Sequence, residues 1–226
     1  MKIELLEETT STNDYIKRYL NGEENIIVST KRQTGGKGTK GRSFLSGEGG
    51  VYLSALTFYK NFPAGDAFRV MAHAAVAVCK TAERFGVSPE IKWANDVFAD
   101  GRKLAGILIE NVFRGANLHA SIVGIGLNAE NDVSALGGIA VSLSELAGTS
   151  ISADEARQAL IEEYQQESSF EEYLARVRFL GRTVRVTEGE REYFATAREI
   201  LGDGRLLIEE DGKLRALSAA EISIKT

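Results

Sequence analysis

The chain has 226 residues, of which 43% are apolar and 26% charged, and this composition excludes an intrinsically disordered chain, a collagen-like repeat and a coiled coil. The formal net charge of −5 argues against general nucleic-acid binding, which usually needs a basic surface. One cysteine excludes an internal disulfide and, with only two histidines, leaves no set of zinc-finger ligands.

Strands and helices alternate in the first 90 residues. Short apolar runs, with a long polar segment between the last two, predict strands at 2–6, 26–29 and 51–58. Ser11 is placed to cap a helix over 12–20, and Gly86 to follow the end of an alanine-rich helix over 66–85. The small side chains of the second helix predict close packing against a sheet.

From residue 90 the pattern favours strands, then helices, then strands again. Strands are expected at 90–93, 103–113 and 118–127, and helices follow at 152–166 and 170–179. The last stretch predicts only short strands, at 183–186, 193–200, 205–209 and 214–217. Two Asp-Gly pairs within it indicate hairpin turns. The prediction is an α+β fold, in which a mixed sheet with packed helices over 1–180 precedes a small all-β barrel over 181–226.

The segment 31–42 is the most unusual stretch of the chain. It contains five cationic residues, four glycines and no acid, in a protein that is acidic overall. Glycine N–H groups and cationic side chains together form nests for phosphate or carboxylate groups, whereas the ordinary interpretation of a charge run is a solvated loop. A dinucleotide-binding motif and a P-loop nearly fit, but both need a helix where residues 51–58 predict a strand. The pattern therefore favours an anion site of another type.

A second cluster places polar groups at strand ends. Asn95 and Asp96 follow one strand, and Lys103 opens an apolar strand, where an unpaired lysine is rarely buried. A turn explains Asn95 and Asp96 equally well. The chemical interpretation is a divalent cation held by Asp96 together with phosphates, and a Lys103 side chain directed at the reacting centre.

A third cluster lies at the end of the strand over 118–127. Gly124 and Gly126 lie two residues apart, so one face of the strand lacks side chains there and could accept either a flat ligand or a closely packed helix. Asn128, just beyond them, could bind a base or close a turn. His73 and Cys79 are expected to be packed within the alanine-rich helix. No Ser-His-Asp or Cys-His arrangement for nucleophilic catalysis is therefore predicted.

Taken in order, these clusters resemble the signatures of the biotin protein ligase family. The resemblance rests on Ser11-Thr-Asn13, Gln33-Thr-Gly-Gly-Lys-Gly-Thr-Lys-Gly-Arg-Ser-Phe44, Lys92-Trp-Ala-Asn-Asp96, Lys103-Leu-Ala-Gly-Ile-Leu-Ile-Glu110 and Gly124-Ile-Gly-Leu-Asn128. It implies a class II synthetase-like catalytic domain followed by an SH3-like domain. It also implies the monofunctional form, without the N-terminal DNA-binding domain that some relatives carry.

The resemblance implies ATP-dependent biotinylation of a protein lysine through biotinyl-5′-AMP. ATP and biotin are the expected substrates, with Mg²⁺, and the expected partner is the acceptor lysine of a biotin carboxyl carrier protein or domain. DNA and membranes are not expected partners, and the protein is expected to be cytoplasmic, as a monomer or homodimer. The first step joins two anions, so the site must supply positive charge and in-line positioning.

Carried over position by position, the resemblance makes Lys103 the principal catalytic residue, bridging the biotin carboxylate and the α-phosphate, and Lys37 a second catalytic cation. The biotin-binding residues that it implies are Ser11, Thr12, Asn13, Gln33, Lys37, Gly38, Thr39, Lys103, Gly106, Gly124 and Gly126. Those implied for ATP and the adenylate are Arg42, Phe44, Lys92, Asn95, Asp96, Lys103 and Asn128. Asp96 is also the residue that would hold Mg²⁺.

The glycine-rich segment departs from the family pattern at two positions where arginine is usual. Lys37 keeps the charge without the planar guanidinium, and Thr39 removes the charge. The hypothesis that follows is a weaker hold on the acyl-adenylate, which would then escape and label nearby lysines. Phe44 and Ala94 also stand where the family often has tryptophan and proline.

Two alternative functions remain open at this point. One is a lipoate or octanoate ligase of the same superfamily, which Ser11-Thr-Asn13 and Gln33 disfavour because polar groups suit a ureido ring better than an alkyl chain. The other is a non-catalytic biotin-binding module, which would not need Lys103, Asn95 or Asp96.

Overall fold

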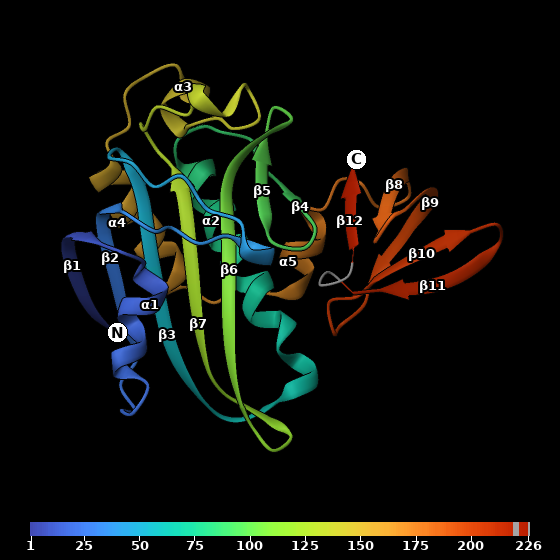
Figure 1. The fold of residues 1–226 in the computed structure, drawn as a ribbon, viewed down its shortest axis with the longest axis horizontal. Helices are drawn as coiled ribbons and strands as arrows, with labels where there is room; N and C mark the ends of the chain where they lie inside the picture. Colours follow the sequence, from blue (N-terminus) through green and yellow to red (C-terminus); the bar gives the residue numbers. More distant parts are fainter. Residues whose placement is uncertain (219–221, 226) are drawn as a thin grey trace.

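The computed structural model describes residues 1–218 and 222–225, which form two sheets with helices packed around the larger one (Figure 1). The larger sheet has the order β1-β2-β3-β7-β6-β5-β4, with β1 parallel to β2 and the other pairs antiparallel. Its strands are β1 (Lys2–Thr9), β2 (Ile26–Gln33), β3 (Gly50–Pro63), β4 (Glu90–Lys92), β5 (Asp96–Ala99), β6 (Arg102–Arg114) and β7 (Asn117–Asn128).

Helices cover both faces of this sheet, because alternate residues of its central strands are apolar in both directions. Ile27 packs into the core under α2 (Phe68–Arg84), whereas Ile26 and Val28 pack with Ile16 of α1 (Thr12–Ile16) on the opposite face. The alanine-rich side of α2 is buried, as the sequence predicts. The face of the sheet that carries α1 also carries the segment between β2 and β3, which crosses in front of β7 and β6 (Figure 1).

Local signals explain where most helices begin and end. Gly86 has a φ of +75° just after α2, a conformation that favours glycine. Capping boxes at Ser152–Glu155 and Ser169–Glu172 start α4 (Ala153–Tyr164) and α5 (Phe170–Ala175). No helix in the described part of the chain is long and apolar enough to cross a membrane.

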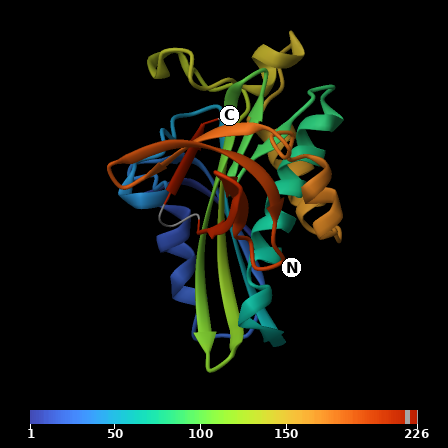
Figure 2. The ribbon, with the colours of Figure 1, turned by 90° about the vertical axis from the view of Figure 1, so that its right-hand side faces the viewer.

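The smaller sheet lies against the body of the protein (Figure 2). Its antiparallel strands follow the order β11-β10-β9-β8-β12 and comprise β8 (Thr183–Glu188), β9 (Arg191–Ile200), β10 (Leu206–Glu210), β11 (Lys213–Leu217) and β12 (Ile222–Lys225). The Trp93 indole donates a 2.9 Å hydrogen bond to the carbonyl of Gly204, and the Phe68 ring lies so close to Gly204 that a side chain there would collide with it. Buried residues of the smaller sheet join those on the α2 face of the large sheet in one core, and the residues packed under α1 form a second cluster.

The predicted α+β fold class is confirmed, and the element boundaries differ in places. Residues 12–20 form only one α-helical turn and a half before a 3-10 turn, Lys17–Tyr19, and the Ser11 hydroxyl makes no capping hydrogen bond. Two strands, β5 and β12, and one α-helix, α3 (Leu143–Ala147), were not predicted, nor were the short 3-10 turns. The division at residue 180 stays a prediction; the second sheet starts at Thr183.

Candidate functional site

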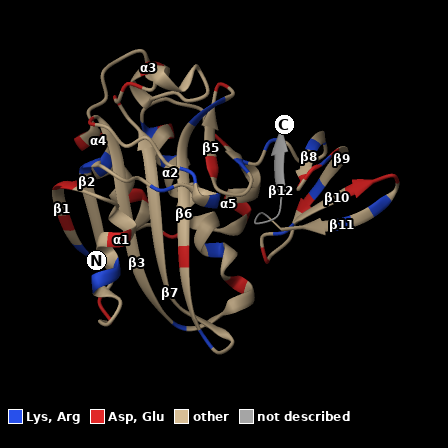
Figure 3. Cartoon of the chain, viewed as in Figure 1, with Lys and Arg blue, Asp and Glu red and all other residues tan. Residues whose placement is uncertain are grey.

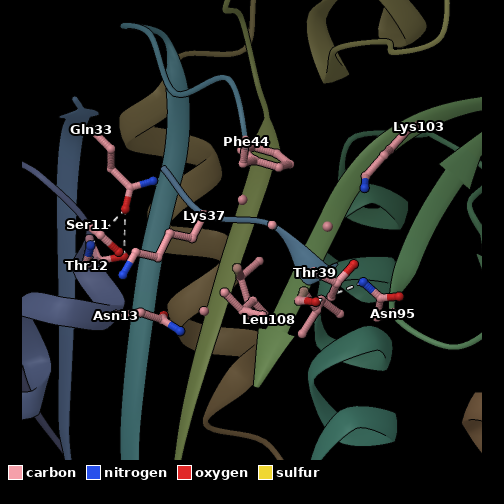
Figure 4. Close-up of a pocket in the computed structure, with 16 residues that line it drawn as sticks. Ser11, Thr12, Asn13, Gln33, Lys37, Thr39, Phe44, Asn95, Lys103 and Leu108 are labelled. Atoms are coloured by element: carbon pink, nitrogen blue, oxygen red, sulfur yellow. Dashed lines mark hydrogen bonds between the residues drawn. The ribbon is translucent and has the colours of Figure 1, made fainter. Parts of the chain in front are cut away.

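A cavity opens on the face of the large sheet that carries α1, beneath the segment between β2 and β3 (Figure 4). The cavity and its open mouth together enclose about 490 Å³, which includes space open to solvent. Its walls come from α1, the end of β2, the glycine-rich segment, β6 and β7. They consist of Ser11, Thr12, Asn13, Gln33, Lys37, Gly38, Thr39, Phe44, Asn95, Lys103, Gly106, Ile107, Leu108, Gly124, Ile125 and Gly126.

One end of the cavity is lined by short polar side chains from α1 and β2. The Gln33 amide oxygen accepts hydrogen bonds from the backbone N–H of Thr12 (2.8 Å) and from its hydroxyl (3.1 Å), and the Gln33 amide nitrogen donates to Ser46 Oγ (3.0 Å). Ser11, Thr12 and Asn13 are all buried. This end of the cavity is therefore a preorganised polar wall rather than a flexible surface.

Asn13 is held from two sides by residues that the sequence analysis did not identify. Its Oδ1 lies 2.6 Å from Ser54 Oγ, and its Nδ2 donates to Glu110 Oε1 at 3.1 Å. The strand period could have identified Glu110. Every second residue of a strand points to the same face, so Glu110 shares the face of β6 that carries Gly106 and Leu108, and both of these line the cavity. Ser54 had no comparable local signal, since its contacts to α1 span 41 and 42 residues of sequence.

Three strand glycines that the resemblance implies for biotin line the cavity, and contacts with other side chains give a reason for small residues there. Gly106 of β6 pairs with Gly126 of β7, and the Phe44 ring rests on them. A Cβ at Gly126 would lie 2.5 Å from the ring, and one at Gly106 would lie 3.1 Å from Lys103 Nζ. At Gly124 a Cβ would collide with Oδ1 of Asn13. Neighbouring side chains of the protein thus leave no room for a Cβ at Gly124 and Gly126, whereas the contacts at Gly106 are only tight.

The opposite end of the cavity is charged. Lys103 Nζ forms a 2.7 Å ion pair with Asp96 Oδ1, and the Asn95 amide donates to the same carboxylate (3.3 Å) and to the carbonyl of Ile107 (3.0 Å). The backbone of Lys103 is bonded on both sides to the segment before α3, because its N–H donates to Ile139 and its carbonyl accepts from Val141. The lysine at the start of the apolar strand is thus both paired and anchored.

Other predicted residues lie beside the cavity rather than in it. Arg42, Lys92 and Asp96 line an adjoining groove of about 1570 Å³, which shares several walls with the cavity. Asn128 lines neither of these two spaces: it is 4% exposed, and its amide donates to the carbonyl of Val141 (3.2 Å) while accepting from Asn131 (3.1 Å). Its contact with an adenylate stays a prediction.

A magnesium site would have to be completed by a substrate. No group of three or more His, Cys, Asp or Glu side chains that could hold a metal ion occurs among the residues that the structure describes. Asp96 and Asn95 nevertheless offer two oxygen-bearing side chains at the charged end of the cavity. Because Mg²⁺ is commonly bound by one or two carboxylates together with substrate phosphates, this donor set fits the ion when a nucleotide is present.

Comparisons with known proteins find similar sequences along most of the chain. Residues 5–128 match the model of the biotin/lipoate A/B protein ligase family, and residues 179–225 match the biotin protein ligase C-terminal domain. The chain is 29% identical to the bifunctional ligase/repressor BirA of Salmonella typhimurium over 86% of its own length, but it spans only 65% of that relative. It is 26% identical to a biotin–[acetyl-CoA-carboxylase] ligase of Mycobacterium tuberculosis, covering 98% of this chain and 88% of the relative.

A likeness also exists among solved structures. The biotin protein ligase of Aquifex aeolicus, in complex with biotin and ATP, superimposes with a TM-score of 0.76 over 99% of this chain and 98% of that one, at 24% sequence identity. At this level of identity the likeness establishes a shared fold, which includes both the sheet that carries the cavity and the smaller C-terminal sheet.

Proposed function

The chain belongs to the biotin/lipoate A/B protein ligase family, whose model matches more than half of its residues, and from this premise we propose that it is a biotin protein ligase. In this reaction ATP activates biotin as biotinyl-5′-AMP, and the biotinyl group then passes to a lysine of a biotin carboxyl carrier protein or domain. The observation that carries the proposal is a single cavity with a preorganised polar wall at one end and the Lys103–Asp96 pair at the other.

The polar wall supports biotin as the acid. A ureido ring offers two N–H donors and one carbonyl acceptor, and the wall presents hydroxyl and amide groups from Ser11, Thr12, Asn13 and Gln33. These groups are held by hydrogen bonds within the protein, so they would meet the ring without reorganising. The Phe44 ring and the backbone of Gly124 and Gly126 would flank its apolar portion.

The charged end supports the first chemical step. A biotin carboxylate oxygen would attack the α-phosphorus of ATP, forming a P–O bond as the bond to pyrophosphate breaks. Lys103, held by Asp96, would lie between the two anions and lower their repulsion. The Lys37 side chain is directed to the polar end of the cavity (Figure 4), and its catalytic role stays a prediction. Arg42, Lys92 and Asn128 would serve the nucleotide. Mg²⁺, held by Asp96 and Asn95 with the phosphates, would supply further charge neutralisation.

The second step needs access for an external lysine. Its uncharged amine would attack the acyl carbon of biotinyl-5′-AMP, AMP would leave, and the amine would lose a proton as the amide forms. The groove that adjoins the cavity supports such access, since Lys103 lines both spaces. No protein nucleophile takes part in this scheme. The oligomeric state and the cytoplasmic location stay predictions.

Lipoate or octanoate is the alternative acid, because the family model covers lipoate ligases as well. An alkyl chain would leave the hydrogen-bonding groups of the polar wall unused and desolvated, which costs binding free energy. The non-catalytic module is disfavoured because a biotin-binding site needs no Lys103–Asp96 pair.

Replacement of Lys103 tests the proposed chemistry. Removing one preorganised positive group from a reacting centre lowers turnover by about 100- to 1000-fold, so Lys103→Ala is expected to reduce biotin-dependent pyrophosphate release by that factor. Lys80→Ala is a matched control, because Lys80 is similarly exposed and forms a 2.6 Å ion pair with Glu172, outside the cavity walls. Equal pyrophosphate release by both variants would contradict the role proposed for Lys103.

A further inference from the structure

The side chain of Asp14 joins the glycine-rich segment to α1. Asp14 directly follows Asn13, and its Oδ2 lies 2.5 Å from Nζ of Lys37, which belongs to the wall of the cavity. Its Oδ1 lies 3.2 Å from Nζ of Lys17. The hydrogen bond from Lys37, followed by that from Lys17, lowers the pKa of the Asp14 carboxyl group, so it is an anion at neutral pH.

The same chain of charges continues to β6. Lys17 Nζ lies 2.6 Å from Oε2 of Glu110, whose other oxygen accepts from the amide of Asn13. The series Lys37–Asp14–Lys17–Glu110 therefore alternates in sign, is neutral as a whole, and begins at Lys37, a residue of the cavity wall. Figure 3 shows an acidic position on α1, basic positions on the 3-10 turn that follows it, and an acidic position in the middle of β6. Three separate parts of the chain meet in this network.

The glycine-rich segment is held differently at its base and at its tip. At its base, backbone hydrogen bonds join Gly35 to Thr10 (2.8 Å) and Phe44 to Gly36 (2.9 Å). At the tip, between Lys37 and Arg42, the chain turns through Lys40 and Gly41 with positive φ angles. The Lys37–Asp14 pair is a side-chain link between this tip and α1, directly above the polar wall.

The strength of this link suits a segment that opens and closes. The side chains of Lys37 and Asp14 are 50% and 37% exposed, and ion pairs in such surroundings contribute about 1 kcal/mol or less. The link therefore contributes little to overall stability, but it changes the equilibrium between open and closed segments by up to about fivefold. An effect of this size changes where the segment lies without changing whether the protein folds.

We propose that Asp14 is a positioning residue that seats Lys37, and with it the tip of the glycine-rich segment, over the cavity. The proposal rests on the proposed function in one respect, namely that the cavity binds biotin. Asp14 does not touch the substrate in this account and acts through Lys37. Removing its charge releases the tip, so that biotin must close the segment at the expense of its own binding.

Two independent measurements test the proposal. Asp14→Asn is expected to raise the KM for biotin in pyrophosphate release with kcat unchanged, because KM follows the inverse of the closed population, and to accelerate tryptic cleavage after Lys40 and Arg42, because such cleavage follows the open population. The two factors multiply to the shift in the equilibrium between open and closed segments, which is at most about fivefold. In a Lys37→Gln background, the same substitution is expected to have neither effect. Asp66→Asn, which removes another surface pair three residues apart (Asp66–Arg69), should behave like the parent protein.

The outcomes are distinguishable. An Asp14→Asn effect of equal size with and without Lys37 would overturn the proposal, as would unchanged cleavage of the segment. If no acid supports pyrophosphate release but cleavage still depends jointly on Asp14 and Lys37, the proposed function fails and the positioning role of Asp14 stands.

Discussion

Gly124→Ala is the substitution for which the structure predicts the sharpest effect on the polar wall. The added methyl group would collide with Oδ1 of Asn13 and would lie 3.0 Å from its Cγ, so the Asn13 amide must move. Movement breaks its contacts with Ser54 (2.6 Å) and Glu110 (3.1 Å). A displaced Asn13 amide would no longer be oriented for its proposed hydrogen bond to biotin, which contributes about 1.4 kcal/mol, so the Kd for biotin is expected to rise roughly tenfold.

The assay is calorimetric titration of biotin into Gly124→Ala and into a matched control. Gly65→Ala is that control, because a Cβ at Gly65 meets no atom within 4 Å and its φ is not in the left-handed region. Thermal melting of both variants shows whether the added methyl group disturbs the fold as well.

A second variant locates the cause of the effect. If Asn13 mediates it, Gly124→Ala should weaken biotin binding much less when Asn13 is already replaced by alanine. The reasoning is refuted if Gly124→Ala binds biotin within twofold of Gly65→Ala, or if its effect is the same without Asn13.

Two further predictions concern stability. Burial lowers the pKa of His73, whose ring contacts Ser168 Oγ and the carbonyl of Tyr164. Because the unfolded chain binds the proton at a higher pH than the folded chain, Tm is expected to fall as the pH drops below about 6.5. In His73→Gln, Tm measured between pH 7.5 and 5.5 should lose this dependence on pH. Trp93→Phe should lower the free energy of unfolding in urea by about 2 kcal/mol, because it leaves the buried carbonyl of Gly204 without its 2.9 Å partner. Circular dichroism is the appropriate signal, since Trp93 is the single tryptophan, and an unchanged midpoint would contradict the role of this contact.

Much of the fold was predictable because most elements are long and regularly patterned. The alanine-rich α2 and its Gly86 end, and the β6–β7 pair, follow from periodicity and turn residues alone. Short elements were missed where local signals conflict. Residues 96–99 form β5 directly after the turn that Asn95 and Asp96 predict. A capping box pattern at Ser142 and Glu145, which marks α3, was present but spans only five helical residues.

The candidate site divides in the same way. Residues in recognisable motifs, such as Gln33 and Lys103, do line the cavity. Asp14 and Ser54 could not be identified, because their importance comes from contacts between α1, the glycine-rich segment and β3 that no local pattern encodes. Asn128 shows the converse: it stands in a motif, yet its amide is buried among protein groups.

The most direct test of the account is ATP-dependent pyrophosphate release with biotin, lipoate or octanoate as the sole acid and no acceptor protein present. The account predicts release with biotin and not with the two alkyl acids, because only the ureido ring satisfies the polar wall. Release that continues beyond one equivalent would further support the hypothesis that Lys37 and Thr39 hold the adenylate loosely. Pyrophosphate release with lipoate or octanoate but not with biotin would contradict the assignment, and so would release when no acid is present.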